Sequence, residues 1–566
     1  MIRDDLARAV EQALDAAALP EAPNGIVLEP QGGRDRGDWA TPVALALAKA
    51  ARANPFDIAT RIVAALEAAG VPHLDHAEVA KPGFVNFYLA PTWLHDVLRE
   101  VVAAGDRYGT SDALAGERIN LEFVSANPTG PLHAGGGRWV AVGDAIANLL
   151  AAQGATVHRE YYLNDTGNQL ATFRDSLYAR YRGEQPPDDG YQGAYLVDLA
   201  AELHAELGDD VTPDDACEWG VQRIVAGLKD DLGRIGVHFD TWFSERTLHE
   251  RDEVNDVLRV LDERGVLYDH EGARWLRTTD FGDTRDRVLV RSNGSTTYLC
   301  NDLAYHRDKF ARGWNHLIDM WGADHHGQVK STQAGMQALG FGPPPEPEVL
   351  LGQMVKLVRN GAEVRLSKRA GNIVTLADIL DEVDPDVARM TFLLQSIDST
   401  QTFDLDVVTA QSMENPVYYV QYAHARACSI ARHAAEAGVT RRPLDAVDLA
   451  TLVHEREHEL LRALALYPDA VAEAAQTRAP QKACTWVRDF ARAFHGFYRD
   501  CRVVTGDAEL TQARLWLVEA CRIGLANALA LLGVGAPEQM ARIEEDDEDV
   551  AAAAAGDAAS PSATAS

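Results

Sequence analysis

The feature that most constrains the fold is a strand, a turn and a helix that follow one another without interruption. Residues 118–124 are mostly apolar and predict a buried strand, and residues 139–150 predict an apolar helix. Between them, residues 126–137 contain two prolines, which prevent early helix formation, and a run of three glycines. This succession predicts an α/β domain with an open, mostly parallel sheet.

The glycine turn also has the composition of an anion site. A helix N-terminus offers unpaired N–H groups and partial positive charge, and glycines let a phosphate approach the backbone. We expect Gly135, Gly136 and Gly137 to provide that approach and His133 to donate a hydrogen bond to phosphate oxygens. The alternative is a corner whose glycines only allow close packing. The turn lacks the Gly-x-x-x-x-Gly-Lys-Ser/Thr pattern of a Walker A loop.

Changes in pattern divide the chain into four parts. Strands are expected at 84–89 in the first part and at 287–290 and 317–321 in the second. The four parts are a small α/β domain (1–110), a larger α/β domain with a helical insertion at about 165–280 (111–403), a helix bundle (404–543) and a disordered acidic, alanine-rich tail (544–566).

Composition excludes several classes of protein. The 566 residues carry a net charge of −32, which argues against a general affinity for nucleic acid. No stretch approaches the ~18 consecutive apolar residues of a membrane span, and the N-terminus lacks a secretory signal pattern. The six cysteines show no metal-site spacing. We therefore expect a soluble, cytoplasmic protein with reduced cysteines and no membrane association.

A second signal is a basic loop at 364–372 in this acidic and lysine-poor chain. A mobile loop that brings Lys368, with Ser367 beside it, to a polyphosphate would stabilise charge on departing pyrophosphate. The alternative is a solvated surface turn.

Two further segments carry polar groups that suit ligands. Tyr298 and Asp302 would stand one turn apart on a helix face, where a phenol and a carboxylate can hold a cation. The run Asp324-His325-His326 has the residue types of metal ligands. Core packing and an ordinary polar loop are the alternatives.

A helix is expected from Pro416, with Asn415 as its N-cap. Aromatic stripes at helical spacing are usually core, but an exposed stripe beside arginine suits stacking on single-stranded bases. The aromatic and hydrogen-bonding residues of this helix are Tyr418, Gln421, Tyr422, His424 and Arg426.

Taken together and in this order, the segments resemble arginyl-tRNA synthetases, which are class I aminoacyl-tRNA synthetases. Segments 126–136 and 415–426 carry the most specific similarity, and 37–41, 81–84 and 533–538 extend it over nearly the whole chain. His133-Ala134-Gly135-Gly136 resembles the His-Ile-Gly-His signature, and residues 365–369 resemble the Lys-Met-Ser-Lys-Ser loop. The resemblance implies a Rossmann-like catalytic domain, an N-terminal tRNA-binding α/β domain and a C-terminal helical anticodon-binding domain.

The implied reaction activates L-arginine with ATP to arginyl-adenylate and pyrophosphate, and then transfers arginine to the terminal adenosine of tRNA(Arg). ATP would enter with Mg²⁺, without a prosthetic group or a resident metal, and the enzyme would act as a monomer. By similarity, the catalytic residues are His133, Ser367 and Lys368. The implied ATP-binding residues are His133, Gly135, Gly136, Gly137, Asp324, His325 and Lys368. The implied arginine-binding residues are Glu122, Asn127, His133, Tyr298 and Asp302, and the anticodon residues are Tyr418, Gln421, Tyr422, His424 and Arg426.

Two departures separate the chain from the signatures. Gly136 replaces the second histidine of the first signature, and Arg365 replaces the first lysine of the second. Backbone N–H groups of the glycines, or Arg138, would have to substitute for the missing imidazole. Three other hypotheses remain at this point: a nucleotidylyltransferase, a DHH-type phosphoesterase, and a catalytically silent tRNA-binding relative of the synthetases.

Overall fold

The computed structural model describes residues 2–31, 36–341, 347–364, 374–409 and 415–541. Two compact units emerge, and neither is continuous in sequence. The first contains the N-terminal domain with segments Ala427–Leu466 and Arg492–Gly524. The second contains Gly109–Arg426 with Tyr467–Ala491 and the chain from Leu525 onward. Helices of the predicted C-terminal bundle are therefore divided between the two units.

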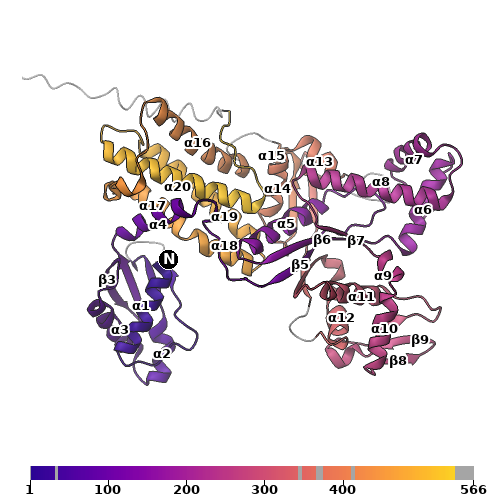
Figure 1. Ribbon diagram of the computed structural model, residues 1–566, viewed down its shortest axis with the longest axis horizontal. Coiled ribbons are helices and arrows are strands. Elements are labelled where there is room, and N and C mark those ends of the chain that lie inside the picture. Colours follow the sequence, from indigo (N-terminus) through magenta and orange to yellow (C-terminus); the bar gives the residue numbers. More distant parts are fainter. Residues whose placement is uncertain (1, 32–35, 342–346, 365–373, 410–414, 542–566) are drawn as a thin grey trace, which may run out of the picture. The chain divides into compact units, whose positions relative to one another are not determined.

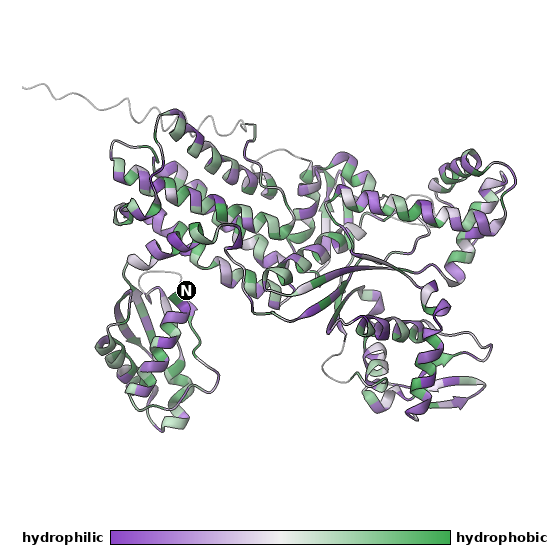
Figure 2. Cartoon of the chain, in the orientation of Figure 1, coloured by the Kyte–Doolittle hydropathy of each residue, from purple (hydrophilic) through white to green (hydrophobic). Residues whose placement is uncertain are grey.

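The N-terminal domain contains a four-stranded antiparallel sheet with helices (Figure 1), where the sequence predicts a small α/β domain without fixing the number or direction of the strands. Its strand order is β1-β2-β4-β3, and the predicted strand at 84–89 is β4. Each helix carries both hydrophilic and hydrophobic residues (Figure 2), because one face packs into the domain core. The elements are α1 (Ile2–Ala16), β1 (Glu29–Pro30), β2 (Trp39–Thr41), α2 (Val43–Ala51), α3 (Pro55–Ala69), β3 (Leu74–Ala80), β4 (Phe84–Leu89) and α4 (Thr92–Ala104).

A five-stranded parallel sheet forms the centre of the second unit. Its strands are β5 (Arg118–Glu122), β6 (Thr156–Leu163), β7 (Thr241–Ser244), β11 (His316–Gly322) and β12 (Glu348–Gly352). The order β12-β11-β5-β6-β7, with every pair parallel, is the doubly wound arrangement of a Rossmann-like domain. The chain reverses its winding between β5 and β11, so ligands are expected at the carboxyl ends of these two strands. The predicted strand–turn–helix is confirmed as β5 and α5 (Gly136–Ala152).

The predicted insertion is shorter and less uniform than expected. Between β6 and β7 the chain forms three helices, α6 (Gly167–Tyr181), α7 (Tyr195–Leu207) and α8 (Pro213–Arg234). The interval 165–280 also contains β7, the edge strand of the central sheet, so it is not one helical excursion. The strand β7 was not predicted because it is only four residues long and lies in an acidic interval.

A small antiparallel sheet follows β7. It has the order β10-β9-β8, so the predicted strand at 287–290 exists but belongs to this sheet rather than to the parallel one. Short connections favour antiparallel pairing, since a parallel pair needs a long crossover. The elements are α9 (Arg246–Glu250), α10 (Glu253–Glu263), β8 (Leu267–His270), β9 (Ala273–Leu276), β10 (Arg287–Val290) and α11 (Tyr298–Ala311).

The chain then completes the parallel sheet and becomes helical. The third sheet of the second unit has the order β14-β13-β15. The elements are α12 (His326–Ala338), β13 (Val355–Arg359), β14 (Ala362–Glu363), α13 (Leu376–Glu382), α14 (Pro385–Leu393), β15 (Gln401–Asp404), α15 (Leu405–Val408), α16 (Pro416–Glu436), α17 (Glu455–Ala465), α18 (Tyr467–Gln476), α19 (Pro480–Asp500) and α20 (Ala508–Leu532). The predicted helical character after residue 404 is confirmed.

Two general expectations bear on the environment of the chain. All six cysteines are free and buried. One helix, α20, is long and apolar enough to cross a membrane by length and composition, and 61% of its apolar stretch is buried in the protein. Core helices of soluble proteins have the same properties.

Candidate active site

The turn after β5 is held in an unusual backbone conformation. Val124 and Ser125 both have positive φ, at 69° and 41°, which non-glycine residues adopt rarely. The Ser125 hydroxyl donates to Glu122 Oε1 at 2.9 Å and accepts from the Tyr162 backbone N–H at 3.0 Å. These bonds join the turn to β5 and β6 and offset the backbone strain, as is common at functional sites.

The His133 turn pairs with a distant segment of the chain. The Ala134 N–H donates to the Val374 carbonyl at 3.0 Å, and the Leu376 N–H donates to the Leu132 carbonyl at 2.8 Å. The first signature therefore lies beside the segment that directly follows the second. Ser367 and Lys368 themselves lie outside the described residues.

Close packing explains the glycines that open α5. A Cβ on Gly136 would lie 2.7 Å from Leu132 Cδ1, and one on Gly137 would lie 2.8 Å from Phe392 Cε2. Since Leu132 is buried, a histidine at position 136 would require it to move. The replacement of the second signature histidine is therefore matched to the packing of this chain.

Arg138 cannot take the place of the missing imidazole, contrary to one sequence expectation. Its side chain is fully buried and donates to the carbonyl oxygens of Ser396 at 2.6 Å and Ser399 at 2.7 Å. It also reaches the Gln353 carbonyl at 3.2 Å. These bonds tie the first turn of α5 to segments that flank the third sheet.

Tyr298 and Asp302 share one face of α11, as the sequence predicts. Tyr298 is the first residue of the helix, and the Thr297 hydroxyl caps it by accepting from the Cys300 N–H. Both side chains line a cavity of about 200 Å³, together with Gln328. Other lining residues are Arg287, Val288, Arg291, Thr297, Leu299, Ser331 and Thr332.

Asp302 has the most unusual carboxyl group of the site. None of the described side chains forms a hydrogen bond or an ion pair with it. The nearby Arg287 binds Asp283, and Arg291 donates to Ser295 and Thr296. Burial, reinforced by Glu122 and opposed by His306, raises the pKa of Asp302 to about 7. A bound cation would favour its ionised form.

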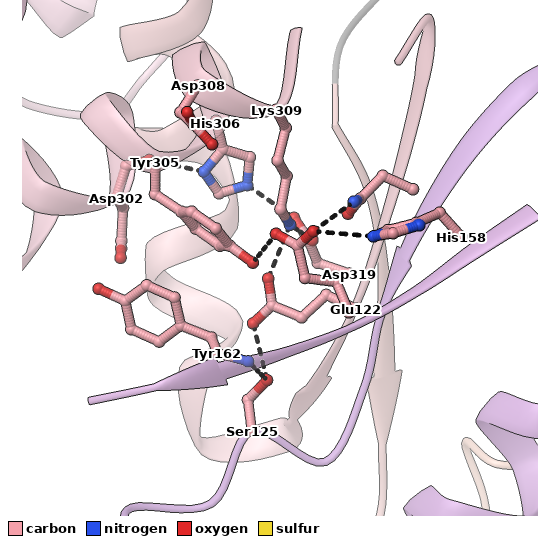
Figure 3. A network of polar contacts seen from close by, with 12 residues as sticks. Glu122, Ser125, His158, Tyr162, Asp302, Tyr305, His306, Asp308, Lys309 and Asp319 are labelled. Atoms are coloured by element: carbon pink, nitrogen blue, oxygen red, sulfur yellow. Dashed lines mark hydrogen bonds and ion pairs between the residues drawn. The ribbon is translucent and has the colours of Figure 1, made fainter. Parts of the chain in front are cut away.

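Glu122 lies at the end of β5 in a buried ion-pair network (Figure 3). Its Oε2 accepts from Lys309 Nζ at 2.7 Å, and the same ammonium donates to Asp319 Oδ1 at 2.7 Å. Asp319 Oδ2 lies 2.7 Å from His306 Nε2. No sequence motif pointed to Lys309, His306 or Asp319 as parts of the site. For His306 and Lys309 the available signal was the polar residues that recur at helical spacing on α11 in a chain with few lysines. Asp319 lies on β11.

A second buried carboxylate lies on β6. Glu160 accepts two bonds from Arg312, at 2.6 and 2.7 Å, one from the Tyr305 hydroxyl at 2.7 Å and one from Asn120 at 2.9 Å. Although burial raises it, the hydrogen bonds from Arg312 and His158 hold the pKa of Glu160 well below its usual range. This carboxylate is saturated and has no capacity for a substrate.

A larger cavity of about 850 Å³ adjoins the first, because Tyr298 and Arg291 line both. Glu245 forms part of its wall, is 2% exposed, and accepts from Asn301 Nδ2 at 2.7 Å. No sequence motif pointed to Glu245, since it lies outside the signatures and follows the short strand β7.

The structure does not bring Asn127 into the cavity of Tyr298 and Asp302. Asn127 Nδ2 donates to Gln169 Oε1 at 2.5 Å, and both residues line a separate cavity of about 360 Å³ beside α6. Asp324 and His325 follow β11 and are exposed. Within the described ranges, no group of three or more His, Cys, Asp or Glu residues is arranged to hold a metal ion.

The helix from Pro416 has a mixed character. Asn415 Oδ1 accepts from the Val417 N–H at 3.1 Å, which confirms the predicted cap. Gln421 and His424 are buried and bind the backbone oxygens of Gly535 and Pro537, at 3.0 and 2.9 Å. These two side chains are therefore turned into the fold, contrary to the expectation that they would be offered to RNA.

The three remaining residues of the predicted stripe are half-buried. Tyr418 and Tyr422 retain partial exposure, and the Arg426 guanidinium lies 4.5 Å from the centre of the Tyr422 ring. Arginine against an aromatic face is a common arrangement for stacking on bases.

Comparisons with known proteins agree with this geometry. An arginine–tRNA ligase of Syntrophotalea carbinolica is 46% identical over 543 residues, which covers 94% of this chain and 97% of the relative. One of Kineococcus radiotolerans is 44% identical over 553 residues and covers 95% and 98%. The chain belongs to the arginine–tRNA ligase family. Membership excludes the nucleotidylyltransferase and DHH-type hypotheses.

Three family models match successive parts of this ligase-family chain. They are the arginyl tRNA synthetase N terminal domain at 4–89, the catalytic domain of class I (R) tRNA synthetases at 212–403, and the DALR anticodon binding domain at 420–540. The solved arginyl-tRNA synthetase of Thermus thermophilus has the same fold, with a TM-score of 0.75 at 22% identity over 95% of this chain and all of that one.

Proposed function

We propose that this member of the family ligates arginine to tRNA(Arg) in two steps. An arginine carboxylate oxygen attacks the α-phosphorus of ATP, the bond to the β-phosphate breaks, and pyrophosphate leaves. The 2′-hydroxyl of the terminal tRNA adenosine then attacks the arginyl carbonyl carbon and releases AMP. No covalent enzyme intermediate forms, so catalysis consists of positioning and charge stabilisation.

The observation that carries the proposal is the Asp302 carboxylate, which forms an ion pair with no cation among the described residues and lines a cavity together with Gln328 of α12, the helix that follows β11. A guanidinium is planar and always charged, and it binds carboxylates through paired N–H donors. We assign the guanidinium to Asp302, with Tyr298 at the cavity mouth and Gln328 as a further acceptor. Glu122 and Asn127 would contact the substrate near its α-amino and carboxylate groups.

ATP is assigned to the N-terminal end of α5. The His133 imidazole would bind the phosphates, and the N–H groups of Gly135, Gly136 and Gly137 would join it by exchanging the bonds that they now donate to His133 and Ala134. The exposed Asp324 and His325 would meet the adenosine. Ser367 and Lys368 would stabilise the departing pyrophosphate. Mg²⁺ would enter as part of the nucleotide substrate, held chiefly by its phosphates.

The tRNA is assigned to the N-terminal domain and the C-terminal helices. On α16, Tyr418, Tyr422 and Arg426 are the candidates for stacking on anticodon bases, whereas Gln421 and His424 would support that surface from within the fold. We propose that the enzyme acts as a monomer in the cytoplasm.

The decisive experiment is arginine-dependent ATP–pyrophosphate exchange, with and without tRNA. We expect exchange to require tRNA, as in the family that the chain resembles. Replacement of Lys368 by alanine should slow it at least tenfold, about 1.4 kcal/mol, with little change in melting temperature. An unaffected rate would remove Lys368 from the mechanism.

The assay also tests the remaining hypothesis of a silent tRNA-binding relative. Such a protein would bind tRNA without any arginine-dependent exchange. Exchange that proceeds fully without tRNA would contradict the expected order of events instead.

A further inference from the structure

The inner face of α11 is polar where a doubly wound fold normally packs an apolar helix face. Asp302, Tyr305, His306 and Lys309 occur at i, i+3, i+4 and i+7, so they lie on one side of the helix. Tyr305, His306 and Lys309 are all at most 3% exposed. A face of this kind is costly to bury and persists only if its charges are matched.

Four of the buried groups form a closed charge balance. Lys309 Nζ donates to both Glu122 and Asp319. His306 Nδ1 lies 2.7 Å from the Asp302 backbone oxygen, and its Nε2 faces Asp319. Both ring nitrogens therefore face acceptors, which only the imidazolium form satisfies. Two cations and two anions sum to zero, and the saturated Glu160–Arg312 pair is separate from them.

Asp302 is outside this balance. Its carboxylate lies apart from the ion pairs around Lys309 (Figure 3) and faces the smaller cavity. The network thus leaves one carboxylate of the α11 face without a direct counter-charge among the described residues, as the single positive charge of a guanidinium requires.

We propose that Lys309 is a positioning residue that sets the charge of the arginine cavity. By neutralising Glu122 and Asp319, it confines the available negative charge of this helix face to Asp302. The inference rests on the proposed function, since it takes arginine as the occupant of the cavity. Lys309 itself is fully buried and does not line the cavity.

The size of the effect follows from distance. Seven residues of helix separate Lys309 from Asp302, which is about 10 Å along the axis. At an effective dielectric constant of about 20, one unit of charge at that distance shifts a titration midpoint by about one pH unit.

The variants leave in place the other charged or titratable groups around Lys309 and Asp302. They are Glu160 and Tyr162 on β6, Glu245 after β7, Arg287 and Arg291 at the cavity, and Tyr305 and Arg312 on or next to α11.

The test measures the dissociation constant of arginine by calorimetry between pH 5.5 and 8.5 on the full chain. For Lys309→Met, we expect binding about tenfold weaker than wild type at pH 6.5 and within about twofold of it at pH 8.5, because the midpoint moves up by about one unit. Packing damage would instead weaken binding equally at every pH.

Two further variants make the sign of the effect decisive. Glu122→Gln leaves an excess positive charge, so its midpoint should move down by about one unit. Combining Lys309→Met with Glu122→Gln removes one charge of each sign and should restore the wild-type midpoint, even if absolute affinity changes. Lys482→Met, which removes an exposed lysine paired with Glu473, should leave the profile unchanged.

The possible results distinguish a failure of this inference from a failure of the proposed function. Midpoints that do not move, or that move in the same direction in both single variants, would overturn the inference. If Lys309→Met does not fold, Glu122→Gln and the double variant decide by the same criterion. A wild-type protein that binds no arginine at any pH would count against the proposed function rather than against the role of Lys309.

Discussion

The two ends of the proposed site use different chemistry. At the start of α5 the chain has glycines whose N–H groups donate to His133 and to the Ala134 carbonyl, and the guanidinium of Arg138 is buried and donates to carbonyl oxygens. On the inner face of α11, Lys309 forms ion pairs with Glu122 and Asp319, and Asp302 is not part of these pairs. In the proposed site the phosphates of ATP would meet the backbone and His133, whereas the guanidinium of arginine would meet the one carboxylate that lies outside the ion pairs.

This difference determines how each end should respond to substitution. Backbone groups cannot be deleted, so at the α5 end a side-chain substitution can remove only the His133 donor, and a change of shape there should act mainly on stability. The α11 end should respond to changes of charge and pH.

The largest effect is expected for Asp302→Asn. Loss of the only carboxylate assigned to the guanidinium should reduce kcat/KM for arginine in the exchange reaction about 10³-fold, about 4 kcal/mol. Asp256→Asn, on the exposed face of α10, is the matched control and should have no effect. A loss below tenfold for Asp302→Asn would mean that another group binds the guanidinium.

A smaller loss is expected for His133→Ala at the other end. We expect kcat for activation to fall about 10²-fold, because one hydrogen-bond donor to the developing phosphate charge is removed. The dissociation constant of arginine should stay the same, since His133 does not line the cavity of Asp302. Weaker arginine binding would show that the two ends are not independent.

In the wild-type protein the dissociation constant of arginine should change about tenfold per pH unit below pH 7. Because the pKa of Asp302 is raised to about 7, arginine must displace a proton at lower pH, and its dissociation constant should rise about tenfold per unit below pH 7. Calorimetry in two buffers should detect the released proton. A flat profile would exclude Asp302 as the titrating group.

The same raised pKa has a consequence for stability. The folded form binds the proton more tightly than the unfolded form, so the stabilisation is complete below the unfolded pKa of about 4 and is lost as pH rises through about 7. Asp302→Asn should therefore become more stable relative to wild type between pH 4 and 8 in denaturant titrations.

The smallest effect on activity is expected for Gly136→His, which restores the missing signature histidine. The new Cβ would crowd Leu132, so the free energy of unfolding should fall by about 1–3 kcal/mol without a faster exchange reaction. Gly227→His on α8, where a Cβ meets nothing within 4 Å, is the control. A faster exchange reaction would show that shape does not limit this end.

The sequence by itself determined the local units. The strand–turn–helix of β5 and α5, the strand at 84–89, the start of α11 at Tyr298 and the cap at Asn415 depend on neighbours within a few residues. Signature motifs are equally local, and the family followed from them.

Tertiary structure alone decided which groups remain available. Glu122, Lys309 and Asp319 come from segments nearly 200 residues apart and meet only because β5 and β11 are neighbours in the sheet. The same applies to Gln421 and His424, which pattern alone assigned to RNA and which the chain at 535–537 engages. Local pattern states which groups a chain carries, but burial and pairing decide which of them are left to bind a substrate.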